Sequence, residues 1–367
     1  MKRLLTPAPS VNHVRRQESM SVLPADWVRE ARVGINLGNV LDAPYEGRWA
    51  PIARERYFDD YARAGFSSVR IPVRWDKHTE RVAPFRVDPA FLARVEQVVG
   101  WSLKRGFRTI VNTHHDDWLD GAKDTKTFEA ELARFVSVWS QVSKRFANAS
   151  DGLLAFEVYN EPHLNMNVGW LNAMNSAVLP VLRTHNPTRN VLLGGLRWMN
   201  PGWIVANPDA LVFPEDPHLL LEVHSYDPYS FCGSHGDLPL EPSWDTASVD
   251  KWVDSLHAWA TQKQISIVLG EFGCNITQQN RTGRYAWYQH VTRHARSNGW
   301  AAMVWDDGGH FAIYNRNGGG WDHDALAALG LDAKPKRKRP AMVEEAEESE
   351  EEQHGQISSV EAAMTPT

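Results

Sequence analysis

Two glutamates follow short apolar runs that have the length and composition of buried strands. The first run, residues 153–158, is interrupted at Glu161 and Pro162, because a proline has no N–H to donate to a neighbouring strand. The second run, residues 266–273, delivers Glu271 in the same way. Either carboxyl group alone could simply face solvent. Two such groups in one chain favour carboxylate-pair catalysis, in which one acid transfers protons and the other attacks or assists.

The elements that must position these acids alternate regularly along the chain. Apolar runs of strand length begin about 30 to 50 residues apart, the spacing of repeated βα units. These runs look continuously apolar, as strands buried on both faces do. The pattern predicts a single α/β catalytic domain folded as a (β/α)8 TIM barrel, with Glu161 ending the fourth strand and Glu271 the seventh. The expected strands cover residues 33–39, 68–73, 108–115, 153–160, 190–195, 219–226, 266–273 and 302–307.

The stretches between the runs carry helix signals. Asp88 and Pro89 combine an N-cap with a proline at the first helical position, and Gly106 is placed to end the same helix in the left-handed conformation. Apolar residues between them fall on one stripe. A doubly wound open sheet is the competing architecture, but no glycine-rich phosphate loop follows the first strand. Similar helical patterns cover residues 52–64, 127–146, 168–184, 249–262 and 284–297.

Eight short motifs follow one another along the chain: GINLGN (34–39), LDAPYEGRW (41–49), VRIPVRW (69–75), NTHH (112–115), NEP (160–162), HSYDP (224–228), GEFG (270–273) and WDDGG (305–309). In this order they resemble the motifs of glycoside hydrolase family 5 cellulases, which belong to a large clan of retaining TIM-barrel glycosidases. The resemblance covers roughly residues 30–331, and it is specific because all the motifs occur together in the family's order. Asn112 departs from the pattern, since relatives often carry Asp there; this concerns the packing of the site.

The resemblance implies a retaining double displacement that needs no cofactor. Glu161 would be the general acid and base, and Glu271 the nucleophile. Retaining enzymes hold such carboxyl groups about 5–5.5 Å apart, whereas inverting enzymes need about 6.5–9.5 Å. The charge on Glu271 would raise the pKa of Glu161, since like charges disfavour ionisation. That pKa would fall once the glycosyl-enzyme intermediate removes the charge.

The resemblance also implies a set of substrate-binding and supporting residues. Arg70 and Tyr226 would donate hydrogen bonds to Glu271, Asn160 would hold the sugar 2-hydroxyl, and Trp305 would lie under the sugar at the cleavage point. The set is completed by His114 and His224, which would orient Glu161 or sugar hydroxyls, and by His115, Asn39, Asp42 and Trp49. The alternative role for Arg70 is that of a structural ion-pair partner, and the alternative for His224 is a core position. For Asn39, Asp42 and Trp49 the alternative is that they shape the first loop.

The run from His114 to Asp117 permits a rival interpretation as a metal site, because His and Asp are common ligands and barrels often house metal-dependent hydrolases. Adjacent residues on a strand point to opposite sides. We therefore expect that His114 and His115 do not chelate one ion, and that the site binds no metal.

The leading functional hypothesis is an endo-β-1,4-glucanase that acts on a β-linked glucan. The LDAPYEG motif and the doubled histidine resemble a branch of the family in which glucanase and mannanase activities both occur. A β-mannanase, or a dual enzyme acting on mannan as well, is therefore the nearest alternative. A non-catalytic carbohydrate-binding barrel is the alternative from another class, but the presence of both carboxyl groups and their supporting residues argues against it.

Composition agrees with these expectations. The 367 residues are 43% hydrophobic and 23% charged, as in ordinary globular proteins. The net charge of −6 argues against nucleic acid or an anionic membrane as a partner, and we expect a monomer. The 16 tryptophans favour sugar binding weakly, because indole rings stack on sugar rings. We expect Cys232 and Cys274 to be free thiols.

Both ends of the chain lie outside the barrel pattern. Residues 1–25 are polar and contain prolines, so we expect a loose lead-in, followed by the barrel over residues 26–333. Residues 334–340 are basic and residues 344–352 almost wholly acidic, which predicts a disordered tail over 334–367. The N-terminus lacks the apolar core of a signal peptide, although polymer substrates of the family usually lie outside the cell.

Overall fold

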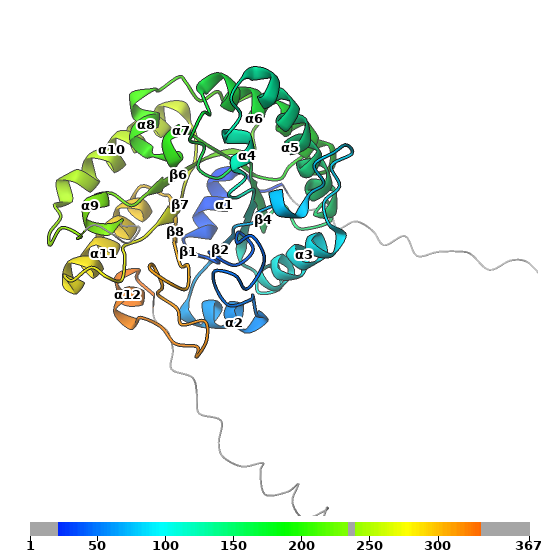
Figure 1. Cartoon of the computed structure of the whole chain (residues 1–367). Coiled ribbons are helices and arrows are strands. Elements are labelled where there is room, and N and C mark those ends of the chain that lie inside the picture. The colour runs from blue at the N-terminus through cyan, green and yellow to red at the C-terminus, as the bar shows by residue number, and fades with distance from the viewer. Residues whose placement is uncertain (1–20, 234–238, 332–367) are drawn as a thin grey trace, which may run out of the picture. The chain divides into compact units, whose positions relative to one another are not determined.

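The strands form a closed barrel. The computed structural model describes residues 21–233 and 239–331, and within them eight parallel strands pair in chain order, with the last strand paired to the first. Figure 1 shows the helices around this ring of strands. The arrangement confirms the predicted (β/α)8 barrel. The strands are β1 (Val33–Asn36), β2 (Ser68–Ile71), β3 (Arg108–Asn112), β4 (Leu154–Glu157), β5 (Val191–Gly194), β6 (Leu219–Ser225), β7 (Ile267–Phe272) and β8 (Ala301–Val304).

Several helices begin where an upstream side chain caps them. Asp88 accepts a hydrogen bond from the N–H of Ala90 and caps α3 as predicted. Asp124 and Asp245 cap α5 and α10 in the same manner, so these helices begin earlier than the apolar pattern indicated. The longer helices are α2 (Glu55–Ala64), α3 (Pro89–Leu103), α5 (Thr125–Arg145), α6 (Val168–His185), α10 (Thr246–Lys263) and α11 (Arg281–Ser297); the shorter ones are α1 (Pro24–Ala31), η1 (Asp76–His78), α4 (Asp117–Asp120), α7 (Leu196–Met199), α8 (Pro201–Ala206), α9 (Tyr229–Cys232) and α12 (His323–Ala328).

Every strand ends before the residue at which we predicted its end. After β1, β3 and β4 the chain turns into loops in which Asn39, His115 and Glu161 have positive φ angles of 63°, 54° and 50°. A strand cannot continue through this left-handed region. Glu161 therefore lies in the loop after β4, not at the end of the strand as predicted.

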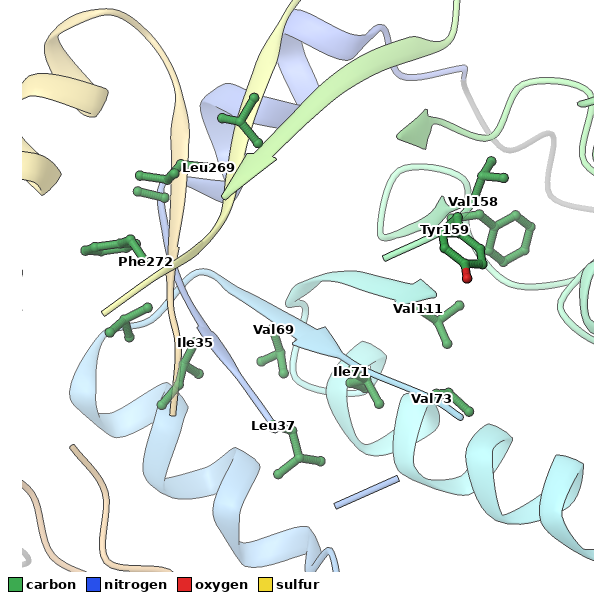
Figure 2. Packing of buried hydrophobic residues seen from close by; sticks show 14 of the residues in the cluster. Ile35, Leu37, Val69, Ile71, Val73, Val111, Val158, Tyr159, Leu269 and Phe272 are labelled. Carbon is green, nitrogen blue, oxygen red and sulfur yellow. The ribbon is translucent and has the colours of Figure 1, made fainter. Parts of the chain in front are cut away.

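Outward-facing strand residues pack against the surrounding helices. Ile35, Val69 and Val111 are fully buried and belong, with Leu269 of β7, to a large apolar cluster that extends through the helices. Figure 2 shows these four side chains within the cluster. Because the apolar face of each strand is covered in this way, alternate residues can face the barrel interior and carry polar groups.

Helix α1 closes the amino-terminal end of the barrel. Its Trp27 joins a second, smaller apolar cluster with inward-facing residues such as Leu192 and Leu220. We expected a loose lead-in as far as residue 25, but α1 already begins at Pro24, because Trp27 is completely buried and anchors the helix. The rest of that lead-in, residues 1–20, and the predicted tail, residues 334–367, lie outside the described residues.

The two cysteines are free. Cys232, at the end of α9, and Cys274, just after β7, are both buried thiols, as predicted. The helices in the described ranges do not combine the length and apolarity needed to cross a membrane.

Candidate active site

The carboxyl ends of the strands border a cavity of about 800 Å³. A cavity of this size in a barrel mouth accommodates a ligand of several hundred cubic ångströms, and it is the usual position of a barrel's active site. The predicted site residues that line it are Asn39, His114, His115, Glu161, His224, Tyr226, Glu271 and Trp305.

The two predicted catalytic glutamates meet in this cavity. A carboxyl oxygen of Glu161 and one of Glu271 lie within 4.8 Å of each other, and a ring nitrogen of His224 lies within the same distance of both. Inverting glycosidases need about 6.5–9.5 Å between their carboxyl groups to admit a water molecule, whereas retaining ones hold them about 5–5.5 Å apart. The pair fits the retaining spacing.

Glu161 sits in an environment that favours its protonated form. Its side chain is 24% exposed, and Oε1 lies 2.9 Å from Nδ1 of His224. Burial raises the pKa of Glu161 above its ordinary value, and the negative charge of Glu271 raises it further, against the opposing hydrogen bond from His224. The direction is the predicted one, but burial contributes more than the charge of Glu271 that we invoked from the sequence.

Glu271 sits in an environment that favours its ionised form. Arg70 donates a hydrogen bond of 2.6 Å to its Oε1, and the Tyr226 hydroxyl donates one of 2.8 Å to its Oε2. Burial alone would raise the pKa of Glu271, but the positive charges of His224 and Arg70 and the hydrogen bond from Tyr226 outweigh burial and lower it. The two acids therefore have pKa values displaced in opposite directions.

A local irregularity in the sheet turns Glu271 into the cavity. The pairing of β6 with β7 shifts its register after Val223, so that His224 lies opposite Glu271. Gly270 precedes this glutamate, and a Cβ atom at Gly270 would lie 1.8 Å from Oε1 of Glu222. Only glycine leaves room for that carboxyl group. The first glycine of the GEFG motif thus admits Glu222 into the barrel.

His224 carries a positive charge between these carboxyl groups. Its Nε2 lies 3.4 Å from Oε1 of Glu222, on the side opposite Glu161. Burial would lower the pKa of His224, but the charge of Glu271 and the hydrogen bonds to Glu161 and Glu222 raise it to about 10. Both ring nitrogens then carry hydrogens and donate.

Arg70 lies beneath the cavity and is completely buried. Its Nε and Nη2 donate to the two oxygens of Glu157, at 2.6 and 2.8 Å. The same Nη2 donates to Oδ1 of Asn160 at 2.6 Å, while Nη1 holds Glu271. Neither Arg70 nor Asn160 is among the residues that line the cavity. Arg70 donates to Glu271 as predicted, and its ion pair with Glu157 holds the guanidinium in the place from which it orients Glu271 and Asn160.

Comparison with known proteins agrees with this geometry. The family model for cellulase, glycosyl hydrolase family 5, matches residues 35–310. The chain belongs to this family. Endoglucanase H of Acetivibrio thermocellus is 42% identical over 316 residues, which cover 84% of this chain and 34% of that protein. The cellulase/esterase CelE of the same organism is 31% identical over 81% of this chain and 39% of its own length.

Solved structures of family 5 enzymes superpose over most of the barrel. The endoglucanase Cel5A of the hyperthermophile Thermotoga maritima has a TM-score of 0.77 and 28% identity, and the match covers 84% of this chain and 100% of that chain. The present chain spans well under half the length of the two Acetivibrio thermocellus relatives, but the match covers the whole of the solved Thermotoga maritima chain.

Further buried polar residues of this family 5 barrel were missed in the sequence. Asn36, Glu157 and Glu222 face the interior and are completely buried. Burial and the charge of Glu157 raise the pKa of Glu222 to about 7. Asn36 and Glu157 end β1 and β4, and Glu222 lies within β6. Each stands at an inward position of an otherwise apolar strand, a signal with a period of two residues. We had treated the strands as continuously apolar, and this interpretation was wrong for the half of the barrel next to the cavity.

Asn112, at which the chain departs from the family pattern, contacts the same group of buried polar residues. Its Oδ1 accepts from the N–H of Val73 at 3.0 Å, and its Nδ2 donates to Oε1 of Glu157 at 3.0 Å. An aspartate at this position could not donate to a neighbouring carboxylate. The amide therefore matches the charge of Glu157.

The doubled histidine does not follow the strand alternation that we assumed. His115 lies beyond the end of β3 with φ of 54°, so both rings face the cavity with their centroids 4.4 Å apart. Ligating atoms of Asp42, His114 and His115 lie within 4.8 Å of one another. The geometric argument against joint chelation is therefore wrong. Burial lowers the pKa of both histidines. The ring of His114 is stacked with that of Trp305, with centroids 6.1 Å apart.

The first loop is shaped by Asp42. This buried carboxyl group accepts hydrogen bonds from the backbone N–H groups of Asn39 and Val40, at 2.9 and 2.8 Å. Asp42 does not line the cavity, whereas Asn39 does. Trp49 is 45% exposed and packs edge-on against His115, with centroids 5.4 Å apart, outside the cavity lining. For Asp42 the structural alternative matches the geometry.

The segment after β5, which carried no predicted site residue, and the segments that follow Tyr226 and Trp305 supply the rest of the lining. Trp198 is 52% exposed, has φ of 58° and stacks on His163 with centroids 5.3 Å apart. The signal in the sequence that could have identified it was a tryptophan shortly after the fifth strand. The unpredicted lining residues are Arg197, Trp198, Asn200, Asp227, Tyr229, Asp307, His310 and Phe311.

Proposed function

We propose that the chain is a retaining endo-β-1,4-glucanase that cleaves internal linkages of β-linked glucans by double displacement. The observation that carries the proposal is one pair of carboxyl groups, Glu161 and Glu271, within 4.8 Å of each other and with pKa values displaced in opposite directions. Two groups with separated pKa values can act as acid and nucleophile at one pH. The similarity to proteins named endoglucanases supports the same conclusion.

In the first step the ionised Glu271 attacks the anomeric carbon of the bound sugar. A bond forms between that carbon and a carboxyl oxygen, and the bond to the leaving oxygen breaks while Glu161 gives that oxygen its proton. Arg70 and Tyr226 keep Glu271 ionised and oriented through the hydrogen bonds described above. Asn160, fixed by Arg70, would contact the sugar 2-hydroxyl through its amide nitrogen.

In the second step the roles of the charges change. Once Glu271 is esterified its negative charge is lost, so the pKa of Glu161 falls and this residue can take a proton from water. The water then attacks the anomeric carbon and releases Glu271, and two inversions give net retention. His224, whose charge is supported by both glutamates, then pairs mainly with the Glu161 carboxylate and stabilises the base form.

The stereochemistry of the product tests this mechanism. Purified protein is incubated with cellopentaose, and proton NMR follows the anomeric configuration of the first reducing ends released. We expect the β-anomer to appear first, before mutarotation. Initial release of the α-anomer would contradict the double displacement, and binding of the oligosaccharide without shortening would favour the carbohydrate-binding alternative. Unchanged hydrolysis after exhaustive chelation would support a cofactor-free reaction.

A dual glucanase and mannanase is the second candidate. Structures of Thermotoga maritima Cel5A, 26% and 27% identical to this chain, are described as complexes with mannotriose and with cellobiose. Rates on carboxymethyl-cellulose, mixed-linkage glucan and mannan, with product lengths, separate the two candidates. Hydrolysis of mannan at a rate comparable with glucan would support the dual enzyme. Sedimentation of the same sample tests the expectation of a monomer.

A further inference from the structure

A group of metal-ligating side chains lies away from the cavity, where α10 packs against α11 (Figure 1). Asp250 and Asp254 are one turn apart on α10, and His290 and His294 are one turn apart on α11. Residues four apart on a helix lie on the same face, so each helix presents its pair to the other. None of these side chains lines the cavity.

The donor atoms converge on one point. Oδ1 of Asp250 lies 2.7 Å from Nε2 of His290 and 3.1 Å from Nδ1 of His294, and all the donors lie within 4.8 Å of one another. In a tetrahedral zinc site with bonds of about 2.0–2.1 Å, two donors lie about 3.3 Å apart. Side-chain rotations that bring the donors to this separation would open a space for the ion.

The fourth side chain orients one of the ligands. Nε2 of His294 lies 3.0 Å from Oδ1 of Asp254. When a carboxylate accepts the hydrogen from one ring nitrogen, the lone pair of the other nitrogen is free for a metal. Asp254 therefore fixes the tautomer of His294 in which Nδ1 faces Asp250 and His290. An ordinary ion pair between helices does not require this second carboxylate behind the ring.

The cluster is accessible to ions from solvent. The side chains of Asp250, His290 and His294 are 39%, 28% and 20% exposed, so they are held by the helices while one side stays open. Two imidazoles and one carboxylate with an open fourth position form a common donor set for zinc and related divalent ions.

We propose that Asp250, His290 and His294 bind one divalent transition-metal ion of the zinc type, with Asp254 as a positioning residue and water completing the coordination. The bound ion joins α10 to α11 and stabilises the folded chain, because a ligand that binds only the native state shifts the unfolding equilibrium. The site is separate from the proposed hydrolytic reaction, and the inference stands whether or not that reaction is the correct one.

Zinc titration of the full chain tests the proposal. The protein is treated with EDTA, dialysed and titrated with ZnCl₂ in a calorimeter. We expect the wild type to bind one more ion per chain than the double variant His290→Ala, His294→Ala. The cavity groups remain intact in both proteins, so the difference reports on this cluster alone. His323→Ala, which removes an exposed histidine from α12, is the matched control and should bind as the wild type does.

Two further measurements separate a metal site from a set of ion pairs. Asp254→Asn should keep the stoichiometry and bind about tenfold more weakly, as loss of an outer carboxylate does at other sites. Zinc should raise the Tm of the wild type and of the control by more than it raises that of the double variant, each measured relative to the same protein in EDTA. Equal stoichiometry and affinity in the wild type and the double variant, or equal zinc-induced Tm shifts, would overturn the proposal.

Discussion

The interior of the barrel has two layers of opposite character. Next to α1 the inward-facing side chains are apolar, among them Leu192, Leu220 and Val268 around Trp27. Further along β1, β2, β3, β4, β6 and β7, toward the cavity, the inward positions carry ionisable or amide groups, and nearly all of them are completely buried. The charged layer consists of Asn36, Arg70, Asn112, Glu157, Glu222, His224 and Glu271.

In this fold the apolar layer contributes stability, and the charged layer carries the chemistry. The apolar layer needs no partners and gains free energy from burial alone. The charged layer is stable only because its charges compensate each other, since an unpaired buried charge is costly. Arg70 and His224 are cations, and the lowered pKa of Glu271 keeps it ionised beside Glu157. Burial and the charge of Glu157 raise the pKa of Glu222 to about 7, which reduces the negative charge that Arg70 and His224 must compensate.

Glu271→Gln, in the charged layer, should cause the largest loss of activity in the series. The amide keeps the shape of the side chain and can still accept from Arg70, so we expect a folded protein. It cannot attack the anomeric carbon, and kcat should fall by a factor on the order of 10⁶, as for other enzymic nucleophiles. Circular dichroism and a hydrolysis assay measure the two effects. Glu215→Gln, an exposed glutamate, is the control. A folded and fully active Glu271→Gln protein would contradict the proposed role.

Glu161→Ala should have the next largest effect, with kcat lowered by about 10²–10⁴-fold. The wild-type pH profile of kcat/KM should be bell-shaped. Its acid limb reflects protonation of the Glu271 carboxylate, whose pKa is lowered, and its basic limb reflects deprotonation of Glu161, whose pKa is raised. The variant should lose the basic limb, and it should lose less activity on substrates whose leaving group needs no proton. An unchanged profile would remove Glu161 from the mechanism.

Arg70→Met tests whether the stability of the charged layer depends on the pairing of its opposite charges. Without the guanidinium, Glu157 and Glu271 lose their buried partner, and the free energy of unfolding should fall by about 3–5 kcal/mol. A carboxyl group with a lowered pKa contributes stability above its ordinary value of 4.5 and loses it as the pH falls through the folded value. The variant should therefore lose less stability between neutral and acid pH than the wild type does.

Urea unfolding at several pH values and a hydrolysis assay measure these effects. Arg29→Met removes an exposed arginine that pairs with the exposed Asp26 on the surface, and it should cost at most about 1 kcal/mol. Equal losses of stability in the two variants would show that the charged layer is no more dependent on its partners than the surface is.

Leu192→Ala probes the apolar layer. Leu192 is completely buried, and its truncation should lower the free energy of unfolding by about 2–5 kcal/mol. Hydrolysis at a temperature where the protein remains folded should keep the wild-type kcat, because the cavity is lined by other residues. Val205→Ala, at a position that is 36% exposed, is the control for loss of methyl groups. A large drop in kcat for Leu192→Ala would show that the two layers are not independent.

The same contrast explains what the sequence could predict. Strand and helix patterns gave the barrel, because repeated apolar runs of fixed length have few other solutions. Glu161 and Glu271 were found because each stands beside a break in an apolar run. Glu157 and Glu222 were missed because a single polar residue inside a strand was averaged with its apolar neighbours, although its position in the two-residue period marks it as inward-facing.

Loop conformation limited the rest of the prediction. Glu161 and His115 lie in loops and have positive φ angles. Because neither residue is a glycine, the sequence does not indicate this backbone conformation. Their side-chain directions therefore could not be obtained by extending the strand alternation. The same holds for Trp198, whose position over His163 depends on an unusual turn after β5.

Tyr226→Phe should have the smallest effect of the series, and it separates position from charge within the charged layer. The variant keeps the ring but loses the 2.8 Å hydrogen bond to Glu271, which is worth about 1.5 kcal/mol as a bond to a charged group, or about tenfold in kcat. Loss of the donor raises the pKa of Glu271, so the acid limb of the pH profile should move to higher pH. Tyr229→Phe changes another cavity tyrosine and should leave that limb in place. A Tyr226→Phe profile with an unmoved acid limb would mean that Arg70 and His224 alone keep Glu271 ionised.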